Sequence, residues 1–209
     1  MAHSEHSLAT YVSDMLALER HVTRPFDAQM KSDEFARSSD GLQIATRLSG
    51  LGHKHADALK DCLDFLGGHE AAGIKDTVGD VTGAVAGAID QMRKTKVSKA
   101  LRDDYTALAL CTAGYTMLQT TALAMRDAKV AGLAERHLQD YAQAVMDIGE
   151  MLPIVVVAEL SDLGLDVDRN AIEPSRQAAK RAWSGGAIAH ESEEGRGIGV
   201  AAGNASSVN

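Results

Sequence analysis

Hydrophobic residues recur along most of this chain at the three- and four-residue spacing that is typical of amphipathic helices. The apolar positions of the first segment are Leu8, Tyr11, Val12, Met15, Val22 and Phe26. They fall on one face at about 100° per residue, which predicts a helix over residues 7–36. A cap signal at residues 38–40 begins a second predicted helix over 41–66, and the glycine pair at 67–68 ends it.

The second half of the chain has the same periodicity, which predicts one helix over residues 99–128 and another over 131–152. The apolar face expected for the first is Ala107, Cys111, Gly114, Leu118, Thr121 and Met125. The face expected for the second is Ala134, His137, Tyr141, Ala144, Ile148 and Met151. Pro153 is expected to break or kink the chain, with shorter helices over 154–163 and 174–183 beyond it.

Three glycines spaced by four, Gly79, Gly83 and Gly87, lie between the second and third of these long helices. On a helix they would form one stripe, and a stripe of glycine indicates very close approach by another helix. Acidic residues flank the stripe, which favours a soluble packing or oligomer contact over a membrane contact. A flexible Gly/Ala linker is the alternative interpretation.

Long helices joined by short links predict an all-α protein built on a four-helix bundle. The β-branched run at residues 155–157 has no partner strand, so we expect it to be helical. We divide the chain into a bundle over 1–165, a short helical extension over 166–183 and an extended Gly/Ser/Ala-rich tail over 184–209. The tail has little to bury, so we expect a neighbouring subunit to order it.

Composition narrows the class of protein further. The 209 residues carry a formal net charge of -8 and no long basic run, which argues against nucleic-acid binding. The most apolar run, MLPIVVVAEL, is too short to cross a bilayer, and the N-terminal residues do not resemble a signal peptide. We therefore expect a cytoplasmic protein without a membrane partner. Cys62 and Cys111 both fall on apolar faces, where we expect them to serve as small core side chains.

An acidic residue interrupts the first apolar face: Glu19 lies four residues after Met15 and three before Val22. On the second helix, His55 shares the apolar face with Leu51, Leu59 and Cys62, while the neighbouring His53 points away. Carboxylates and imidazoles are ligands that suit iron and manganese. Glu19 and His55 are therefore candidate metal ligands inside the bundle.

Four stretches of the chain, together covering about residues 7–152, carry a family resemblance. The stretch SDMLALERHVTR resembles the first helix of the ferritin-like proteins of the YciE/YciF type. KALRDDYTALALCTAGYTML and LAERHLQDYAQAVMDIGEML are similar to the third and fourth long helices of that family. GHKHADALKDCLDFLGG resembles the second helix of bacterioferritins. The resemblance implies a ferritin-like four-helix bundle with extra C-terminal helices, and it implies bacterial stress-response biology.

The resemblance also places the six di-iron ligands of the family on this chain. The Glu of the first helix falls on Glu19 and the His of the second helix on His55, and both are retained. The other four positions fall on Gly52, Gly114, Tyr141 and Ala144. Two surviving ligands cannot supply the bridging carboxylates of a metal pair, so we expect the di-iron site to have degenerated. We further expect Tyr141 to enter the space left by the two glycines.

Three interpretations of Glu19, His55 and Tyr141 stay open. The first is a buried, metal-free hydrogen-bond network, because a buried carboxylate needs donors or a proton. The second is a mononuclear or reshaped metal site that also uses His137. The third is a surface position that the periodicity wrongly places in the core.

Two hypotheses about function follow. The first is a non-catalytic structural or interaction protein without a cofactor, which forms a homo-oligomer through the glycine stripe and the tail. The alternative is a metal-binding stress protein that holds iron or manganese at Glu19 and His55. No Ser-His-Asp, Cys-His or phosphate-loop motif is present in the sequence, so catalysis is the less favoured interpretation.

Overall fold

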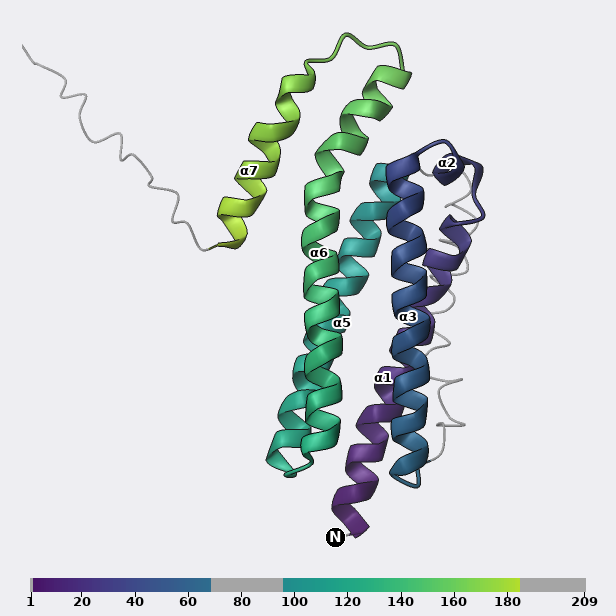
Figure 1. Cartoon of the computed structure of the whole chain (residues 1–209), viewed down its shortest axis with the longest axis vertical. Helices are drawn as coiled ribbons and strands as arrows, with labels where there is room; N and C mark the ends of the chain where they lie inside the picture. The colour runs from purple at the N-terminus through teal and green to yellow at the C-terminus, as the bar shows by residue number, and fades with distance from the viewer. Residues whose placement is uncertain (1, 69–95, 185–209) are drawn as a thin grey trace, which may run out of the picture.

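The computed structural model describes residues 2–68 and 96–184, with side chains from Ser7 onward, and every regular element in these ranges is helical. Four long helices, α1 (Ala2–Gln29), α3 (Ser39–Phe65), α5 (Val97–Ala124) and α6 (Ala128–Asp162), lie side by side (Figure 1). The prediction of an all-α protein is confirmed. The predicted glycine stripe at 79, 83 and 87, and the predicted tail beyond Ser184, lie outside the described residues.

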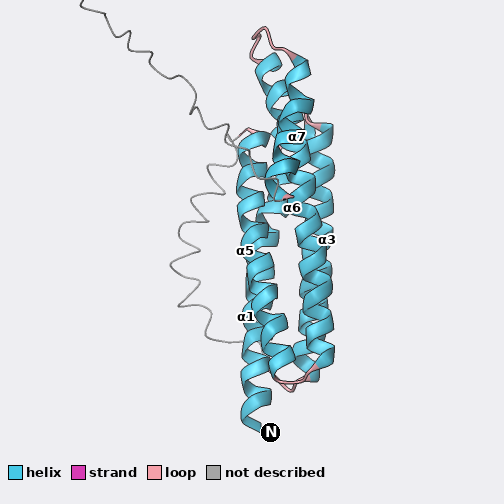
Figure 2. Cartoon of the chain, turned by 90° about the vertical axis from the view of Figure 1, so that its left-hand side faces the viewer, coloured by secondary structure: helices cyan, strands magenta, loops and turns pink. Residues whose placement is uncertain are grey.

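The four long helices form two antiparallel pairs, α1 with α3 and α5 with α6 (Figures 1 and 2). Helices α3 and α5 run in the same direction. The end of α3 lies near the start of α6, where the Lys129 ammonium sits 3.3 Å from the centre of the Phe65 ring. The start of α3 lies against the start of α5, where Gly41 contacts Val97. The link from Gly68 to Lys96 therefore connects opposite ends of the helical array.

The first helix is shorter than the pattern predicts. α1 ends at Gln29, and a separate helix, α2 (Asp33–Ala36), follows instead of one helix to residue 36. The reason is a competing cap: the Ser32 hydroxyl accepts a hydrogen bond from the Phe35 backbone N–H, which starts a new helix. The glycine pair behaves as expected. Gly67 has a φ of 66°, and Gly68 donates its N–H to the Leu63 carbonyl, which closes α3.

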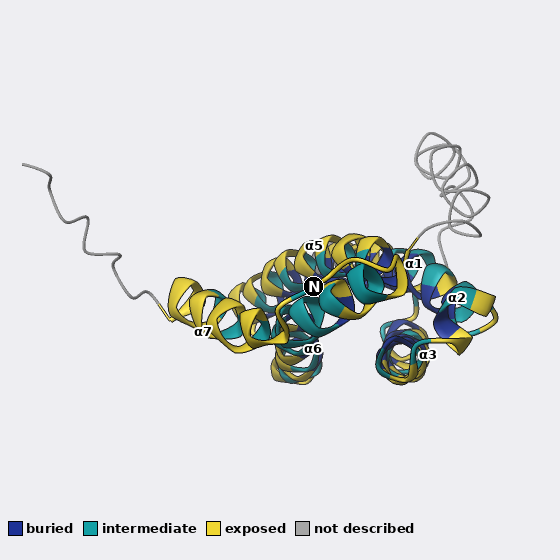
Figure 3. Ribbon diagram, turned by 90° about the horizontal axis from the view of Figure 1, so that it is seen from above, coloured by how far each residue is buried: buried dark blue, intermediate teal, exposed yellow. Residues whose placement is uncertain are grey.

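The expected break at Pro153 is wrong. α6 runs without interruption from Ala128 to Asp162, although proline removes one backbone donor inside it. Ile148 and Val155, on either side of the proline, are both buried, and this packing holds the two halves in one helix. A 3₁₀ turn, η1 (Arg169–Ala171), leads into α7 (Ile172–Trp183), which packs back along α6 on the outside of the array (Figure 3).

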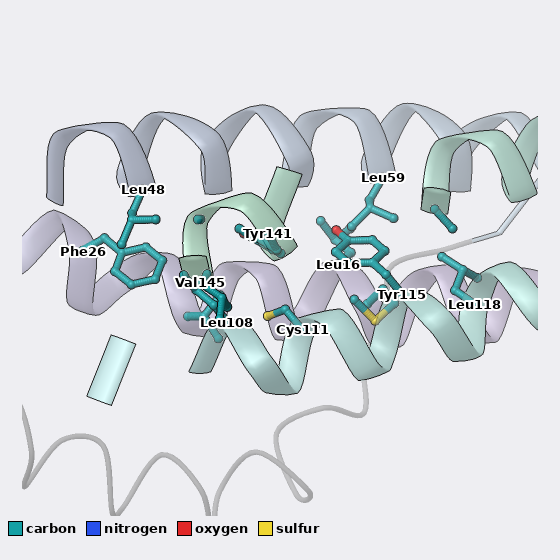
Figure 4. Close-up of a cluster of buried hydrophobic side chains, with 14 of the residues drawn as sticks. Leu16, Phe26, Leu48, Leu59, Leu108, Cys111, Tyr115, Leu118, Tyr141 and Val145 are labelled. Carbon is teal, nitrogen blue, oxygen red and sulfur yellow. The ribbon is translucent and has the colours of Figure 1, made fainter. Parts of the chain in front are cut away.

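The buried face of α5 differs from the predicted one. Its buried positions alternate at spacings of four and three, as in a coiled coil. They are Val97, Leu101, Asp104, Leu108, Cys111, Tyr115, Leu118 and Ala122, with Ala100 beside them. Cys111 and Leu118 were placed correctly, whereas Ala107, Gly114, Thr121 and Met125 are only partly buried. Figure 4 shows the resulting core, in which Tyr115 and Tyr141 lie among leucines from neighbouring helices.

Candidate functional site

Glu19 lies at the middle of α1 with its side chain fully buried, so the interpretation as a misplaced surface residue is wrong. Each of the other three long helices brings at least one polar side chain to it. His55 comes from α3, Tyr115 from α5 and Tyr141 from α6, and all three are 0% exposed. The site therefore forms where the four helices converge, and it depends on all of them.

Both oxygens of the Glu19 carboxylate accept hydrogen bonds from protein groups. The Tyr115 hydroxyl donates to Oε1, and the Tyr141 hydroxyl donates to Oε2. The Nδ1 of His55 lies 3.2 Å from Oε1 and adds a third contact. Hydrogen bonds to a carboxylate compensate for the loss of water around a buried charge. The hydrogen-bonding capacity of the Glu19 carboxylate is therefore met by side chains of the same chain.

His55 links this carboxylate to the surface. Its Nε2 lies 3.1 Å from Oδ2 of Asp140, whose side chain is 42% exposed. An ionised carboxylate only accepts, so His55 can donate to both carboxylates only with a proton on each ring nitrogen. In that state the imidazolium ring lies between two negative groups, and one of them contacts solvent.

His137 completes the cluster from α6, one turn before Tyr141. Its ring stacks on that of His55, with centroids 3.8 Å apart and planes at 10°. Burial, together with the nearby charge of His55, lowers the pKa of His137 to about 3. It is therefore neutral near pH 7. Because the Tyr115 hydroxyl already donates to Glu19, it can accept a hydrogen bond from Nδ1 of His137, 3.0 Å away.

The two tyrosines are held in their protonated form. Burial raises the pKa of Tyr115 and of Tyr141, and the negative charge of Glu19 raises both further. Protonated phenols are the donors that the Glu19 carboxylate requires. The negative charge of Glu19 therefore keeps Tyr115 and Tyr141 protonated, and their hydroxyl groups in turn stabilise that charge.

The expectation that Tyr141 fills the space left by Gly52 and Gly114 is wrong. A Cβ on Gly52 would meet Oγ1 of Thr23 at 2.1 Å, and a Cβ on Gly114 would meet Sδ of Met15 at 2.7 Å. Both occupying side chains belong to α1. The glycines thus allow α1 to approach α3 and α5 closely, while the Tyr141 ring lies edge-on to His55 at 4.8 Å.

The sequence pattern placed Glu19, His55, His137 and Tyr141 in one buried group, and the structure brings these four together. It missed Tyr115 and Asp140. Tyr115 lies four residues after Cys111 and three before Leu118, so helical spacing from those two residues could have found it. Asp140 carried no such signal, because it is partly exposed and contributes only through His55.

The residues present do not fit a di-iron centre. Gly52, Gly114 and Ala144 offer no side-chain ligand, and Glu19 alone cannot replace the several carboxylates that hold two metal ions in such bundles. Three of the buried side chains are better arranged for a single metal ion. One ligand atom from each of Glu19, His55 and His137 lies within 4.8 Å of the others, which is a candidate arrangement for a single ion.

Among the remaining candidate residues, Cys111 borders this cluster, because burial and then the charge of Glu19 raise the pKa of its thiol. His53 is exposed and pairs with Asp27 at 3.1 Å, as the periodicity predicts. Cys62 and Cys111 are buried free thiols. His21 is partly buried. A cavity of about 330 Å³ opens between α2 and the ends of α3, α5 and α6, and no member of the Glu19 cluster lines it.

Comparison with known proteins finds a similar fold but no protein of known activity. No protein-family model and no curated protein matches the sequence. A crystal structure of a protein from Xanthomonas campestris pv. campestris is similar, with a TM-score of 0.61 and 19% identity, over 78% of this chain and 99% of that chain. This similarity concerns the helical fold alone. Within the described residues, no helix is long and apolar enough to cross a membrane.

Proposed function

We propose that this chain is a ferritin-like four-helix bundle whose metal site has been replaced by a hydrogen-bond network, and that it acts as a non-catalytic, self-assembling structural protein. The topology supports the fold. α3 and α5 are parallel, and the chain between them must pass from one end of the array to the other. A single long crossover of this kind distinguishes ferritin-like bundles from simple up-and-down bundles.

One observation carries the proposal for the site. The buried carboxylate of Glu19 accepts hydrogen bonds on both oxygens from two tyrosines and a histidine of the same chain. A metal ion at this carboxylate would have to displace these donors. The network thus performs the neutralising role that a metal performs in a di-iron bundle, and it joins all four helices at their centre.

Self-assembly is supported by apolar side chains that the described helices leave exposed. Leu110, Met117 and Leu123 on α5 are each between 58% and 60% exposed. Large apolar surfaces of this kind often mark contacts between proteins. A structural protein that forms a homo-oligomer would cover them.

Elemental analysis of the purified full chain, together with its mass in solution, tests the proposal. We expect no stoichiometric metal, no rise in Tm when Fe²⁺ or Mn²⁺ is added, and a mass above the 22.1 kDa of one chain. An ion that binds the folded chain would raise Tm by mass action. One iron or manganese per chain, or a strictly monomeric protein, would contradict the proposal.

A single-ion site is the second candidate, and it rests on the proximity of Glu19, His55 and His137. If the protein contains metal, His55→Ala should remove it. His53→Ala provides the matched control, because His53 lies two residues away on α3 but is exposed and pairs with Asp27. Metal retained in the His55 variant would exclude this site.

A further inference from the structure

From Tyr105 onward, the outer surface of α5 differs from that of the other long helices because it carries no charge. No charged residue occurs from Tyr105 to Met125. Exposed positions along it repeat at spacings of four and three, and we call them the outer stripe: Thr106, Leu110, Ala113, Met117, Thr120 and Ala124. Leu110 and Met117 in this stripe are 58% and 60% exposed, and Leu123 beside it is 60% exposed. By contrast, the exposed positions of α3 include Lys54, Lys60 and Asp61.

The threonine hydroxyls on this surface form hydrogen bonds within α5. The hydroxyls of Thr106, Thr116 and Thr120 donate to backbone carbonyls three or four residues earlier in α5, as do those of Thr112 and Thr121. Each donor is thereby satisfied within its own helix. The surface can lose its water without leaving a hydroxyl proton unpaired, which is a requirement for a buried helix contact.

We propose that the outer stripe of α5 is the interface of a two-fold homodimer, in which α5 packs antiparallel against α5 of a second copy. This inference deepens the proposed self-assembly by assigning its contact surface. A two-fold axis uses the same surface on both copies, so the surface must fit itself. The stripe meets this requirement when the axis passes near Gly114 and Tyr115.

In that register each large side chain of the stripe faces a small one. Leu110 lies opposite Thr120 of the second copy and Met117 opposite Ala113, because the members of each pair are equally far from Tyr115 along the helix. Leu123, beside the stripe, lies about level with Thr106. Alternation of large and small residues is what allows two helix surfaces to interdigitate. A parallel arrangement would instead place Met117 against Met117 and Leu110 against Leu110.

The charges at the two ends of the stripe fit the same register. Asp103 lies just before the stripe and Arg126 just after it, and both are exposed. An antiparallel pair brings Asp103 of each copy to Arg126 of the other, whereas a parallel pair brings like charges together. Complementary charges at the rim of an interface help to fix its register.

The mass of the full chain in solution, measured by sedimentation equilibrium, tests this proposal. We expect the unmodified chain to be an assembly of dimers or a dimer, with twice the 22.1 kDa mass as its smallest stable unit. Met117→Glu would place two carboxylates inside the contact, and we expect the dimer to dissociate at least about 100-fold more readily. Met117 is exposed in the single chain, so its helical circular dichroism should not change.

Leu163→Glu is the matched control, because Leu163 is 60% exposed at the end of α6, away from the stripe. We expect it to leave dimerisation unchanged. A dimer that survives Met117→Glu, or one that Leu163→Glu dissociates instead, would overturn the α5 interface while leaving self-assembly intact. A monomeric unmodified chain would overturn self-assembly as well.

Reversal of the end charges tests the antiparallel register. Asp103→Arg should weaken the dimer about 3- to 10-fold, because it places two cations together at each end. Adding Arg126→Asp should restore the affinity to within about twofold by exchanging the two signs. If the double variant is weaker than either single variant, the antiparallel arrangement is wrong.

Discussion

At the scale of single residues, two buried carboxylates of this protein have very different surroundings. Glu19 accepts hydrogen bonds from two phenols and contacts an imidazole. Asp104 on α5 is 3% exposed, and within the described residues its hydrogen bonds come from the amide of Gln29 alone, at 2.7 and 2.9 Å. Burial accordingly raises the pKa of Asp104 to about 7. The first carboxylate is part of a satisfied network, whereas the second is poorly compensated.

The tyrosine donors of Glu19 lead to a first prediction. Tyr141→Phe keeps the ring in place and removes the hydroxyl that donates to Oε2, so a buried charge loses a partner. We expect the free energy of unfolding, measured by urea denaturation near pH 7, to fall by about 1–3 kcal/mol. Tyr11→Phe is the control, because Tyr11 is 40% exposed and should change stability by less than about 0.5 kcal/mol. Equal stability of the two variants would mean that the network does not stabilise the fold.

Asp104 gives a second prediction, which depends on pH. The Oε1 atom of Gln29 is buried without a hydrogen-bond partner among the described residues. Asp104→Asn would remove a buried charge and provide an N–H group that can donate to that oxygen. We expect the Asn variant to be more stable than the unmodified protein by about 1–3 kcal/mol at pH 8, measured by urea denaturation.

The sign of the pH dependence follows from the raised pKa. The folded protein holds the Asp104 proton up to about pH 7, whereas the unfolded chain releases it near 3.8. The unmodified protein therefore loses stability relative to the Asn variant as pH rises from about 4 to 7, by at most about 1.4 kcal/mol per unit. Asp61→Asn is the control, because Asp61 is exposed on α3 and should show no such trend. A constant difference across this pH range would show that Asp104 is ionised throughout.

The sequence predicted part of this site because some of its residues stand out against their surroundings. Glu19 interrupts an apolar face, and His55 shares its face with leucines, so the periodicity alone places both inside. Tyr115 could not be recognised in the same way. It lies on a helix where apolar and small residues occur on every side, so no contrast with charged neighbours marks its face, and only its spacing from Cys111 and Leu118 could have placed it inside.

At the scale of the elements, the composition of α5 explains why its buried face was predicted on the wrong side of the helix. Amphipathic periodicity identifies the buried face by contrast with a charged outer face. α1, α3 and α6 provide that contrast, and their buried faces were largely predicted. α5 has no charged residue between Tyr105 and Met125, so the predicted face was shifted toward Ala107 and Thr121. The same absence of charge is what makes its outer stripe a candidate interface.

Close contact between α1 and α3 gives the element-scale prediction. A Cβ at Gly52 would meet the side chain of Thr23, whereas a Cβ at Gly50, on the same helix, meets nothing within 4 Å. Gly52→Ala must therefore push α1 away, and we expect it to destabilise the protein by about 1–3 kcal/mol. Gly50→Ala should instead stabilise it by up to about 1 kcal/mol through helix propensity. Thermal unfolding of both variants tests this, and the prediction fails if the two substitutions shift Tm in the same direction.

At the scale of the whole molecule, α7 is attached to the helical array more weakly than any of the long helices. It has no buried residue. Its contacts with α6 include ion pairs of Arg176 and Lys180 with Glu150, at 3.1 and 2.9 Å, on a partly exposed surface. Exposed ion pairs contribute about 0–1 kcal/mol each. The helices α1, α3, α5 and α6 share a buried core, and α7 can separate from them without disturbing it.

This difference predicts that the protein does not unfold in a single transition. Trp183, the only tryptophan of the chain, lies on α7 with its ring 6.2 Å from that of Tyr105 on α5, so its fluorescence reports whether α7 is docked. During urea denaturation we expect the tryptophan signal to change at a lower concentration than the helical circular dichroism. Glu150→Gln should lower the fluorescence midpoint further and leave the circular dichroism midpoint nearly unchanged. Glu173→Gln is the control, because Glu173 pairs with Arg176 within α7 itself and not with α6. Coincident transitions in the unmodified protein would show that α7 is a cooperative part of the fold, held by more than its ion pairs.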